Sequence, residues 1–293
     1  MDENMQQNSF TPLHFTSDDG LALYGRDYGS GNSERLPIVC LAGLSRNSRD
    51  FHQLAMWLAL QGRRVITTDY RGRGLSAWDP NPANYNIGRE AQDVVAALRT
   101  LGISRAIFIG TSRGGLILHI LPAIAPDMIA ACVLNDVGPV IEAAGLRLIR
   151  DYLVARPEPK DFAQAARALK TTHGADFPVL DDGDWSDMAY AIFRETGGRI
   201  VPDYDPALVE PLKTMDMDQP LPDLWQQYQA LASIPLLIIR GENSKLLSVD
   251  AAREMVDRHG PDIALVTARG QGHAPILHIP EIRQPISSFI ASI

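Results

Sequence analysis

Short, uninterrupted apolar runs restrict the fold of this sequence more than any other feature. They lie at residues 36–41, 64–68, 106–109, 129–134, 235–239 and 263–267. Each run is too short for a buried helix, and most are rich in Ile, Val and Leu, which is typical of strands buried on both sides. Amphipathic, helix-like stretches lie among them, at 50–60, 89–101, 115–124, 249–258 and 282–290. This alternation predicts an α/β fold with a mostly parallel sheet and helices on both faces.

Two segments near the start of the chain have a different pattern. Residues 13–16 and 21–28 alternate more between polar and apolar side chains, and Asp18-Asp19-Gly20 joins them. Alternation around a short glycine-containing turn is typical of an antiparallel hairpin. We therefore expect these segments to form a hairpin at one edge of the sheet.

The alternation of strands and helices stops between about Pro139 and Ala232. Helix-like segments follow one another here without intervening strands, at 143–155, 161–169, 186–195, 205–213 and 221–231. Turns rich in proline and aspartate separate them. We predict a core domain formed by residues 1–138 and 233–293, with residues 139–232 inserted between two of its strands as a helical cap.

The charge and composition of the chain restrict its partners. The formal net charge is -8 and the arginines are scattered, which argues against nucleic acid or an anionic membrane as the main partner. No apolar run approaches the roughly 18 residues of a membrane span, and MDENMQQNSF lacks the basic start and apolar core of a signal peptide. We expect a cytoplasmic monomer or homodimer that uses no metal and no cofactor, with Cys40 and Cys132 as buried free thiols.

The segment Gly110-Thr111-Ser112-Arg113-Gly114 lies between an apolar strand and a helix. The pattern Gly-x-Ser-x-Gly in this context is typical of a nucleophile elbow, a tight turn whose flanking positions leave no room for side chains. Ser112 would then stand at a helix N-terminus, where developing negative charge is favoured. The alternative is a glycine-rich turn that carries an ordinary surface serine.

Other predicted strand ends carry residues that fit a nucleophilic serine. Gly43 follows the first buried strand, so the backbone N–H of Leu44, together with that of Arg113, would form an oxyanion hole. The next strand is followed by the turn from Asp69 to Ser76, which contains Gly72 and Gly74 and is a second glycine-containing turn after a buried strand. His273 lies in a glycine-rich loop after the last strand, where a general base for Ser112 is expected.

These motifs, in this order, resemble those of the α/β-hydrolase superfamily, specifically its serine hydrolases with a helical cap. The resemblance extends from about Pro12 to Ile293, although the cap matches only in position and helical character. It implies the α/β-hydrolase fold and the chain order serine, acid, histidine. The usual His-Gly of the oxyanion loop is Ala42-Gly43 here, which spares the hole because its donor is a backbone group.

The resemblance leaves open which residue is the acid that supports His273. The family's usual site is the loop 241–247, where this chain has Ser244 and Lys245 instead of an aspartate. Some members place the acid at the end of the strand before the cap, where this chain has Asp136. We favour Asp136, with Glu242 and the absence of any acid as the alternatives.

The sequence therefore predicts a hydrolase with a Ser112, Asp136 and His273 triad that acts on a small acyl substrate, such as a carboxylic ester or an enol-lactone. A carbon–carbon bond hydrolase or a perhydrolase of the same fold remains an alternative, as does a non-catalytic small-molecule receptor. Aromatic side chains of the cap either line an apolar pocket or pack within the cap. They are Trp185, Tyr190, Phe193, Tyr204, Trp225 and Tyr228.

Overall fold

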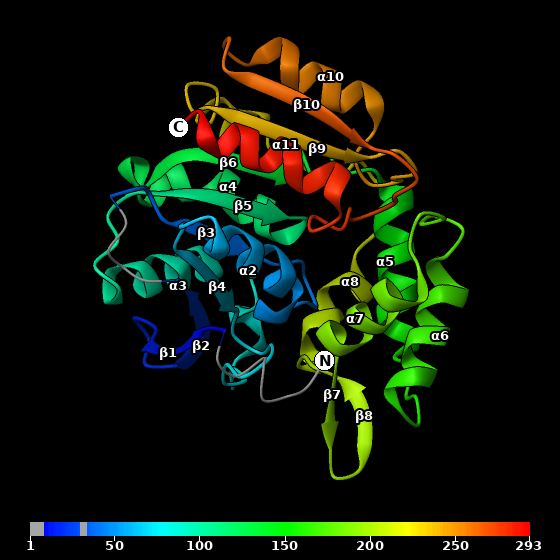
Figure 1. Cartoon of the computed structure of the whole chain (residues 1–293). Coiled ribbons are helices and arrows are strands. Elements are labelled where there is room, and N and C mark those ends of the chain that lie inside the picture. Colours follow the sequence, from blue (N-terminus) through cyan, green and yellow to red (C-terminus); the bar gives the residue numbers. More distant parts are fainter. Residues whose placement is uncertain (1–8, 30–33) are drawn as a thin grey trace.

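A computed structural model describes residues 9–29 and 34–293. Its main sheet has eight strands in the order β1-β2-β4-β3-β5-β6-β9-β10 (Figure 1). The strands are β1 (Thr11–Thr16), β2 (Ala22–Tyr28), β3 (Ile38–Leu41), β4 (Val65–Asp69), β5 (Ala106–Thr111), β6 (Ile129–Asn135), β9 (Leu236–Gly241) and β10 (Ile263–Ala268). Strand β2 pairs antiparallel with β1 and β4, and all other pairs are parallel. The predicted parallel sheet and its edge hairpin are confirmed.

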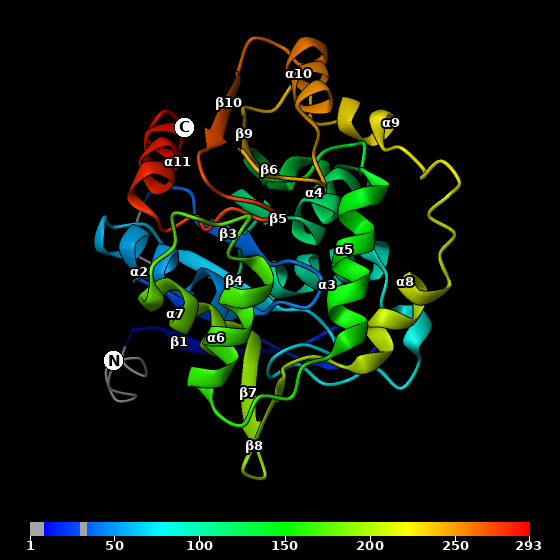
Figure 2. The same ribbon diagram turned by 90° about the vertical axis from the view of Figure 1, so that its right-hand side faces the viewer.

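Helices cover both faces of the sheet (Figure 2). One face packs against α3 (Ile87–Thr100), α4 (Arg113–Ile124) and α10 (Val249–Arg258), and the other against α2 (His52–Leu60) and α11 (Pro280–Ala291). Successive side chains of a strand point to opposite faces, so the central strands supply both apolar cores. In β3, for example, Val39 and Leu41 belong to the first core and Ile38 and Cys40 to the second. This two-sided burial explains why the central strands have continuous apolar sequences.

The two cysteines lie on opposite faces of the sheet. Cys132 belongs to the first core and Cys40 to the second, and both are buried free thiols. Burial raises the pKa of both thiols, that of Cys132 to about 12, because the thiolate would be poorly solvated. Neither thiol is therefore a ready nucleophile.

The segment between β6 and β9 forms a separate group of helices. It contains α5 (Ala143–Ala155), α6 (Phe162–His173), α7 (Asp182–Ile192), α8 (Glu210–Thr214) and α9 (Trp225–Gln229). Helices α5 to α8 gather to one side of the sheet (Figure 1). Helices α6 and α7 share an apolar cluster of their own around Trp185. This packing is consistent with a cap, and the division into core and cap domains stays a prediction.

The expectation that this segment contains no strands was wrong. Residues predicted to end a helix instead form β7 (Phe193–Thr196), which pairs antiparallel with β8 (Arg199–Pro202). Gly197 and Gly198 connect the two strands with φ values of 59° and 74°, a backbone that a two-residue hairpin turn needs and that glycine adopts without strain. The turn therefore ends α7 earlier than its sequence pattern indicates.

Short 3-10 helices complete the chain. They are η1 (Ser48–Phe51), η2 (Pro82–Asn84), η3 (Pro126–Met128) and η4 (Pro206–Val209). The predicted helix at 205–213 is divided into η4 and α8. Pro206 is the first residue of η4 and Pro211 the second residue of α8, positions that proline suits because it has no N–H to donate.

Arg49 of η1 connects the core to the inserted segment. Its guanidinium donates to the backbone oxygens of Tyr190 and Phe193, at 3.0 and 3.2 Å, and forms an ion pair of 2.8 Å with the buried Asp203. Asn47 donates to the backbone oxygen of Ala191 at 3.1 Å. These bonds fix the end of α7 against the start of α2.

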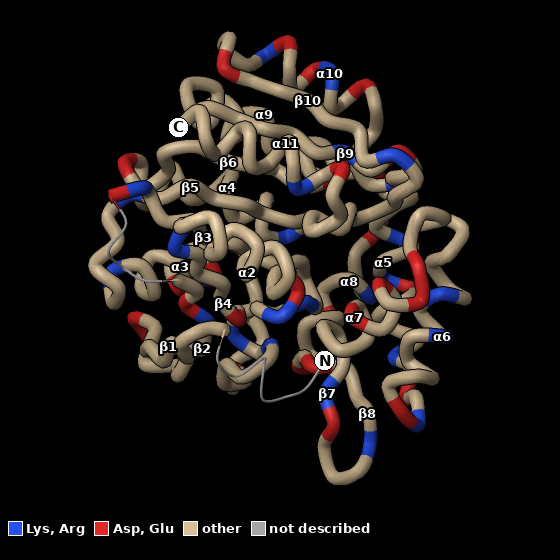
Figure 3. The backbone as a smooth tube through the Cα atoms, viewed as in Figure 1, with Lys and Arg blue, Asp and Glu red and all other residues tan. Residues whose placement is uncertain are grey.

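Basic residues are spread along the chain rather than gathered on one element (Figure 3). No helix within residues 9–29 and 34–293 combines the length and the apolar character needed to cross a membrane. The cytoplasmic location and the monomeric or homodimeric state stay predictions. Residues 1–8, on which the expected absence of a signal peptide largely rests, lie outside the described residues.

The first turn of α4 lies unusually close to β3. A Cβ atom on Gly114 would stand 2.1 Å from the backbone oxygen of Leu41, well inside van der Waals contact. Both groups belong to rigid, buried elements, so neither has room to move away. Only glycine at position 114 allows this crossing.

We predict that Gly114→Ala lowers the free energy of unfolding by about 3 kcal/mol because of this overlap. Gly88→Ala is the matched control, since Gly88 is also the second residue of its helix, α3. A Cβ there would meet only the Asn86 side chain, at 3.4 Å. The control should keep or slightly raise stability, as alanine is the better helix former. Denaturant unfolding measures both, and equal stabilities of the two variants would contradict the steric explanation.

Candidate active site

Ser112 occupies the sharp turn between β5 and α4. Its backbone has φ 51° and ψ -112°, a conformation that residues other than glycine rarely adopt. A Cβ on Gly110 would lie 2.7 Å from the backbone of Gly114, so the turn requires glycine on this side of the serine as well. The Ser112 N–H donates to the backbone oxygen of Asn135 at 3.1 Å. The turn thus holds the Ser112 side chain at the carboxyl edge of the sheet.

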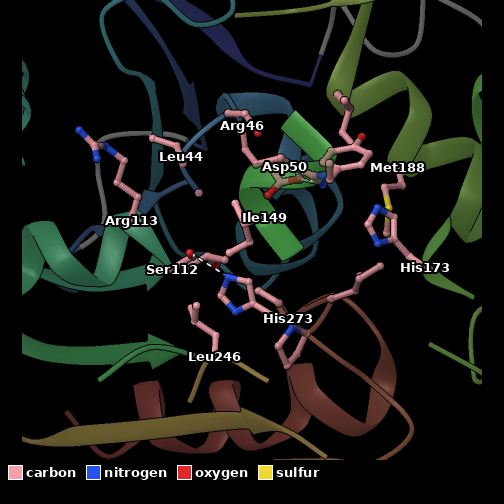
Figure 4. A pocket seen from close by; sticks show the side chains of 18 of the residues that line it. Leu44, Arg46, Asp50, Ser112, Arg113, Ile149, His173, Met188, Leu246 and His273 are labelled. Carbon is pink, nitrogen blue, oxygen red and sulfur yellow. Dashed lines mark hydrogen bonds and ion pairs between the residues drawn. The ribbon is translucent and has the colours of Figure 1, made fainter. Parts of the chain in front are cut away.

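His273 lies in the loop after β10, beside Ser112. A hydrogen bond of 2.9 Å joins His273 Nε2 to Ser112 Oγ (Figure 4). Two buried side chains secure the loop: the Asn135 amide donates to the Pro275 backbone oxygen at 2.9 Å, and Gln271 Oε1 accepts from the Ile276 N–H at 2.7 Å. The loop that carries the imidazole is therefore held in place by bonds additional to those of the ring itself.

Asp136 lies on the opposite side of the imidazole from Ser112. It directly follows β6 and is fully buried, and its Oδ2 is 2.8 Å from His273 Nδ1. The carboxylate also accepts from the Gly241 N–H at 2.8 Å and from the Ser244 hydroxyl at 2.6 Å. Because a carboxylate only accepts, Nδ1 carries the proton, which leaves the Nε2 lone pair to accept from the serine hydroxyl.

The loop after β9 supports the carboxylate of Asp136 rather than supplying one to His273. Ser244, which stands where an aspartate was expected, donates to Asp136. Lys245, which is partly exposed and borders the cavity, pairs with Asp176 at 3.2 Å. The Glu242 side chain accepts from the Gly270 N–H at 2.7 Å, at the base of the histidine loop. The structure therefore brings Asp136, and not Glu242, into contact with His273.

Two backbone N–H groups flank Ser112. The Gly43 backbone oxygen accepts from the Arg46 N–H at 3.1 Å, and in a trans peptide the Leu44 N–H must point the opposite way. Arg113 is the first residue of α4, so its N–H has no acceptor within the helix. Neither amide donates to another residue of the described chain, and both residues border the same cavity as Ser112. Their placement is that of a pair of donors for an anion at the serine.

A cavity of about 430 Å³ lies between the sheet edge and the inserted helices, with Ser112 and His273 on its wall. Its surface is mainly apolar. The aliphatic residues around it include Leu116, Val137, Leu146, Ile149, Met188 and Leu246. A space of this size, largely apolar and with a few polar groups, suits a small organic molecule.

Some polar groups of the cavity, namely Arg46, Asp50 and His173, lie away from Ser112 (Figure 4). Arg46 forms an ion pair with Asp50, and its Nε donates to Asp50 Oδ1 at 2.8 Å. Burial, and secondarily the Arg46 charge, lower the pKa of His173, which also borders the cavity. Arg46 and Asp50 are not among the residues predicted from the sequence to border the site, although their i,i+4 spacing shortly after Gly43 indicates an ion pair at that place.

The six cap aromatics considered as pocket residues do not border the cavity. Trp185 and Phe193 pack inside the cluster shared by α6 and α7, while Tyr228 packs against the sheet. Tyr190 is exposed and stacks on Phe162. The aromatic residues that do border the cavity are Phe51, Tyr152 and Phe177.

The chain is similar in sequence and in structure to several known proteins. Residues 37–278 match the family model described as alpha/beta hydrolase fold. The chain is 31% identical over 246 residues to the 3-hydroxybutyrate-oligomer hydrolase of Cupriavidus necator, covering 81% of this chain and 82% of the relative. It is 28% identical over 274 residues to the 2-(acetamidomethylene)succinate hydrolase of Mesorhizobium japonicum, covering 92% of each. The crystal structure of an alpha/beta hydrolase from Novosphingobium aromaticivorans matches with a TM-score of 0.90 at 40% identity, over 97% of this chain and 99% of that one.

Proposed function

The chain belongs to the α/β-hydrolase family, and from this premise we propose that it is a serine hydrolase that cleaves small carboxylic esters, enol-lactones or similar acyl compounds. One observation carries the proposal: an unbroken series of hydrogen bonds runs from Ser112 through His273 to the buried Asp136, at the wall of an apolar cavity. Such a relay makes a serine hydroxyl nucleophilic.

The first half of the proposed reaction forms an acyl-enzyme. Ser112 Oγ attacks the substrate carbonyl carbon while His273 Nε2 takes the hydroxyl proton. Asp136 holds the imidazole in the required tautomer and stabilises the imidazolium that forms. The N–H groups of Leu44 and Arg113 donate to the oxyanion of the tetrahedral intermediate. When the intermediate collapses, His273 returns the proton to the leaving oxygen, and the acyl group stays on Ser112.

The second half repeats these steps with water. His273 removes a proton from a water molecule, which attacks the acyl carbon and forms a second tetrahedral oxyanion at the same two donors. Collapse then releases the carboxylic acid and returns the proton to Ser112 Oγ. The imidazolium forms next to Asp136, and each oxyanion forms next to the N–H groups of Leu44 and Arg113. Little reorganisation of these groups is therefore needed during the reaction.

The cavity and the relatives support a small substrate. A space of about 430 Å³ falls in the range of small-molecule sites. The curated relatives are named as hydrolases of 3-hydroxybutyrate oligomers and of 2-(acetamidomethylene)succinate. We therefore propose a small acyl compound as the substrate of this chain, without assigning either of these to it.

The alternatives make different experimental predictions. A carbon–carbon bond hydrolase would cleave a ring-cleavage product and leave simple esters intact, whereas a perhydrolase would form peracids from a carboxylic acid and hydrogen peroxide. A non-catalytic receptor would bind a small molecule without turnover. The relay to a buried carboxylate favours an enzyme over a receptor, because a binding protein has no need of an oriented base beside a strained serine.

We expect a fluorophosphonate probe to label the wild-type protein at neutral pH and to leave Ser112→Ala unlabelled. The reagent reacts with an activated serine through the same base and oxyanion donors as an ester. Mass spectrometry of the intact protein and of its peptides locates the adduct. A folded wild-type protein that stays unlabelled would overturn the serine-hydrolase proposal.

We expect Asp136→Asn to lower kcat on p-nitrophenyl esters by about four orders of magnitude, because the tautomer and the imidazolium both lose their support. Glu242→Gln is the control: it alters a carboxylate in the neighbouring loop that contacts Gly270 and not His273. The control should keep most of the activity. The opposite ranking of the two variants, both folded by circular dichroism, would show that the acid has been assigned to the wrong strand end.

We expect Ile149→Ala, at the cavity wall, to enlarge the space for the acyl chain. The ratio of kcat/KM between a longer and a shorter p-nitrophenyl ester should rise by about tenfold, as one to two methylenes gain room to bind. Tyr190→Ala, an exposed residue outside the cavity, should leave this ratio unchanged. If both variants change the ratio equally, the cavity is not the acyl site.

A further inference from the structure

A buried ionic triad lies beneath the two proposed oxyanion donors. Glu90, in the first turn of α3, is fully buried and accepts from two arginines, with Oε1 2.7 Å from Arg73 Nη1 and Oε2 2.5 Å from Arg113 Nε. Arg73 is also fully buried. None of these side chains takes part in the proposed reaction, so the presence of three charged groups here requires an explanation.

The arginine at one end of the triad holds the loop that carries Leu44. Arg73 Nε donates to the backbone oxygen of Leu44 at 2.8 Å. On the other side of Gly43, the Tyr70 hydroxyl donates to the backbone oxygen of Ala42 at 3.2 Å. The peptide that presents the Leu44 N–H is therefore fixed through both of its neighbours.

The arginine at the other end carries the second donor. Figure 4 shows the Arg113 side chain directed away from Ser112. Its Nη2 donates to the backbone oxygen of Tyr85 at 3.1 Å, in addition to the bond with Glu90. The side chain thus anchors the first residue of α4, which borders the cavity and whose backbone N–H donates to no other residue of the described chain.

The charge state of Glu90 is set by its partners. Burial alone would raise the pKa of this carboxyl, but the charges and hydrogen bonds of Arg73 and Arg113 together outweigh burial and hold the pKa below its usual range. Glu90 therefore stays ionised and keeps both arginines in place.

Stability gives no sufficient reason for such a triad. Buried ion pairs recover little more than the cost of desolvating their charges, and apolar side chains of similar volume often stabilise a fold as well or better. The triad instead fixes positions, because a carboxylate between two guanidinium groups holds both of them by directional hydrogen bonds. Here one guanidinium bonds the backbone oxygen of Leu44 and the other belongs to Arg113, and these two residues carry the proposed oxyanion donors.

We propose that Glu90, with Arg73 and Arg113, is a positioning device that sets the separation of the Leu44 and Arg113 N–H groups and so tunes the oxyanion hole. This inference rests on the proposed hydrolase function. Interactions made only with the oxyanion lower the barrier without strengthening substrate binding. Loosening the triad therefore lowers kcat and leaves KM nearly unchanged.

The test compares Glu90→Gln with Asp93→Asn in the full chain. Asp93 lies on the same helix, α3, is buried, and bonds Arg71 twice at 2.7 Å, but Arg71 contacts neither Leu44 nor Arg113 through its side chain. Both variants replace a buried carboxylate of α3 that pairs with arginine by a neutral amide of the same shape, and circular dichroism checks that both are folded. Only Glu90→Gln touches the groups that fix the oxyanion donors.

For Glu90→Gln we expect kcat on p-nitrophenyl acetate to fall by about 10- to 100-fold, with KM changed less than about twofold. Its affinity for a trifluoromethyl ketone, which forms a tetrahedral oxyanion on the serine, should fall by the same factor as kcat/KM. Asp93→Asn should change neither quantity by more than about twofold. Arg113→Gln, at the less buried end of the triad, should reproduce the loss and serves as the deciding variant if Glu90→Gln does not fold.

Three outcomes overturn the inference. The variants at Glu90 and Arg113 keep normal kcat and ketone affinity, or they raise KM alone, or Asp93→Asn loses as much activity as they do. Failure of the proposed function itself is a different result, because then the wild-type protein neither hydrolyses esters nor reacts with a fluorophosphonate.

Discussion

The close approach of α4 to the end of β3 determines the positions of most other groups at the site. Gly114 lets the helix backbone come within reach of the Leu41 carbonyl, and Gly110 gives the same freedom to the strand that precedes it. These two glycines leave room for the sharp turn that the chain makes at Ser112. The same approach puts the first amide of the helix beside the loop that follows β3, so one backbone contact arranges the proposed nucleophile and the proposed oxyanion donors.

The parallel sheet brings the remaining groups to this point. Leu44, Asp136 and His273 each follow the carboxyl end of a strand, and such ends meet along a single edge of a parallel sheet. Residues more than a hundred positions apart in the chain thus become neighbours without any long, irregular excursion. Local hydrogen bonds then fix the positions of these side chains. Ser244 donates to the Asp136 carboxylate, and Asn135 donates to the loop that carries His273.

The sequence predicts the core well because its strands are buried on both faces and therefore apolar throughout, as in β3 and β6. It also predicts the residues at the strand ends, where glycine patterns restrict the backbone around Ser112 and His273. The inserted segment is less predictable. Phe193 has a helical context but extends into a strand because two glycines follow, and the orientation of Tyr190 depends on packing that no local pattern encodes.

The inserted segment leaves the sheet after β6 and returns at β9, and these two strands are hydrogen-bonded neighbours, with Asn135 paired to Ile239. In thermodynamic terms the whole segment is one loop, and the pairing of β6 with β9 holds its two ends together. Doubling the length of a flexible loop costs only about 0.6 kcal/mol in closure entropy, so a long segment at this place adds little to the cost of closing the chain. In the proposed hydrolase, Ser112, Asp136 and His273 all come from outside this segment, whereas part of the cavity wall comes from it, so the wall can vary in sequence while the reacting groups stay the same.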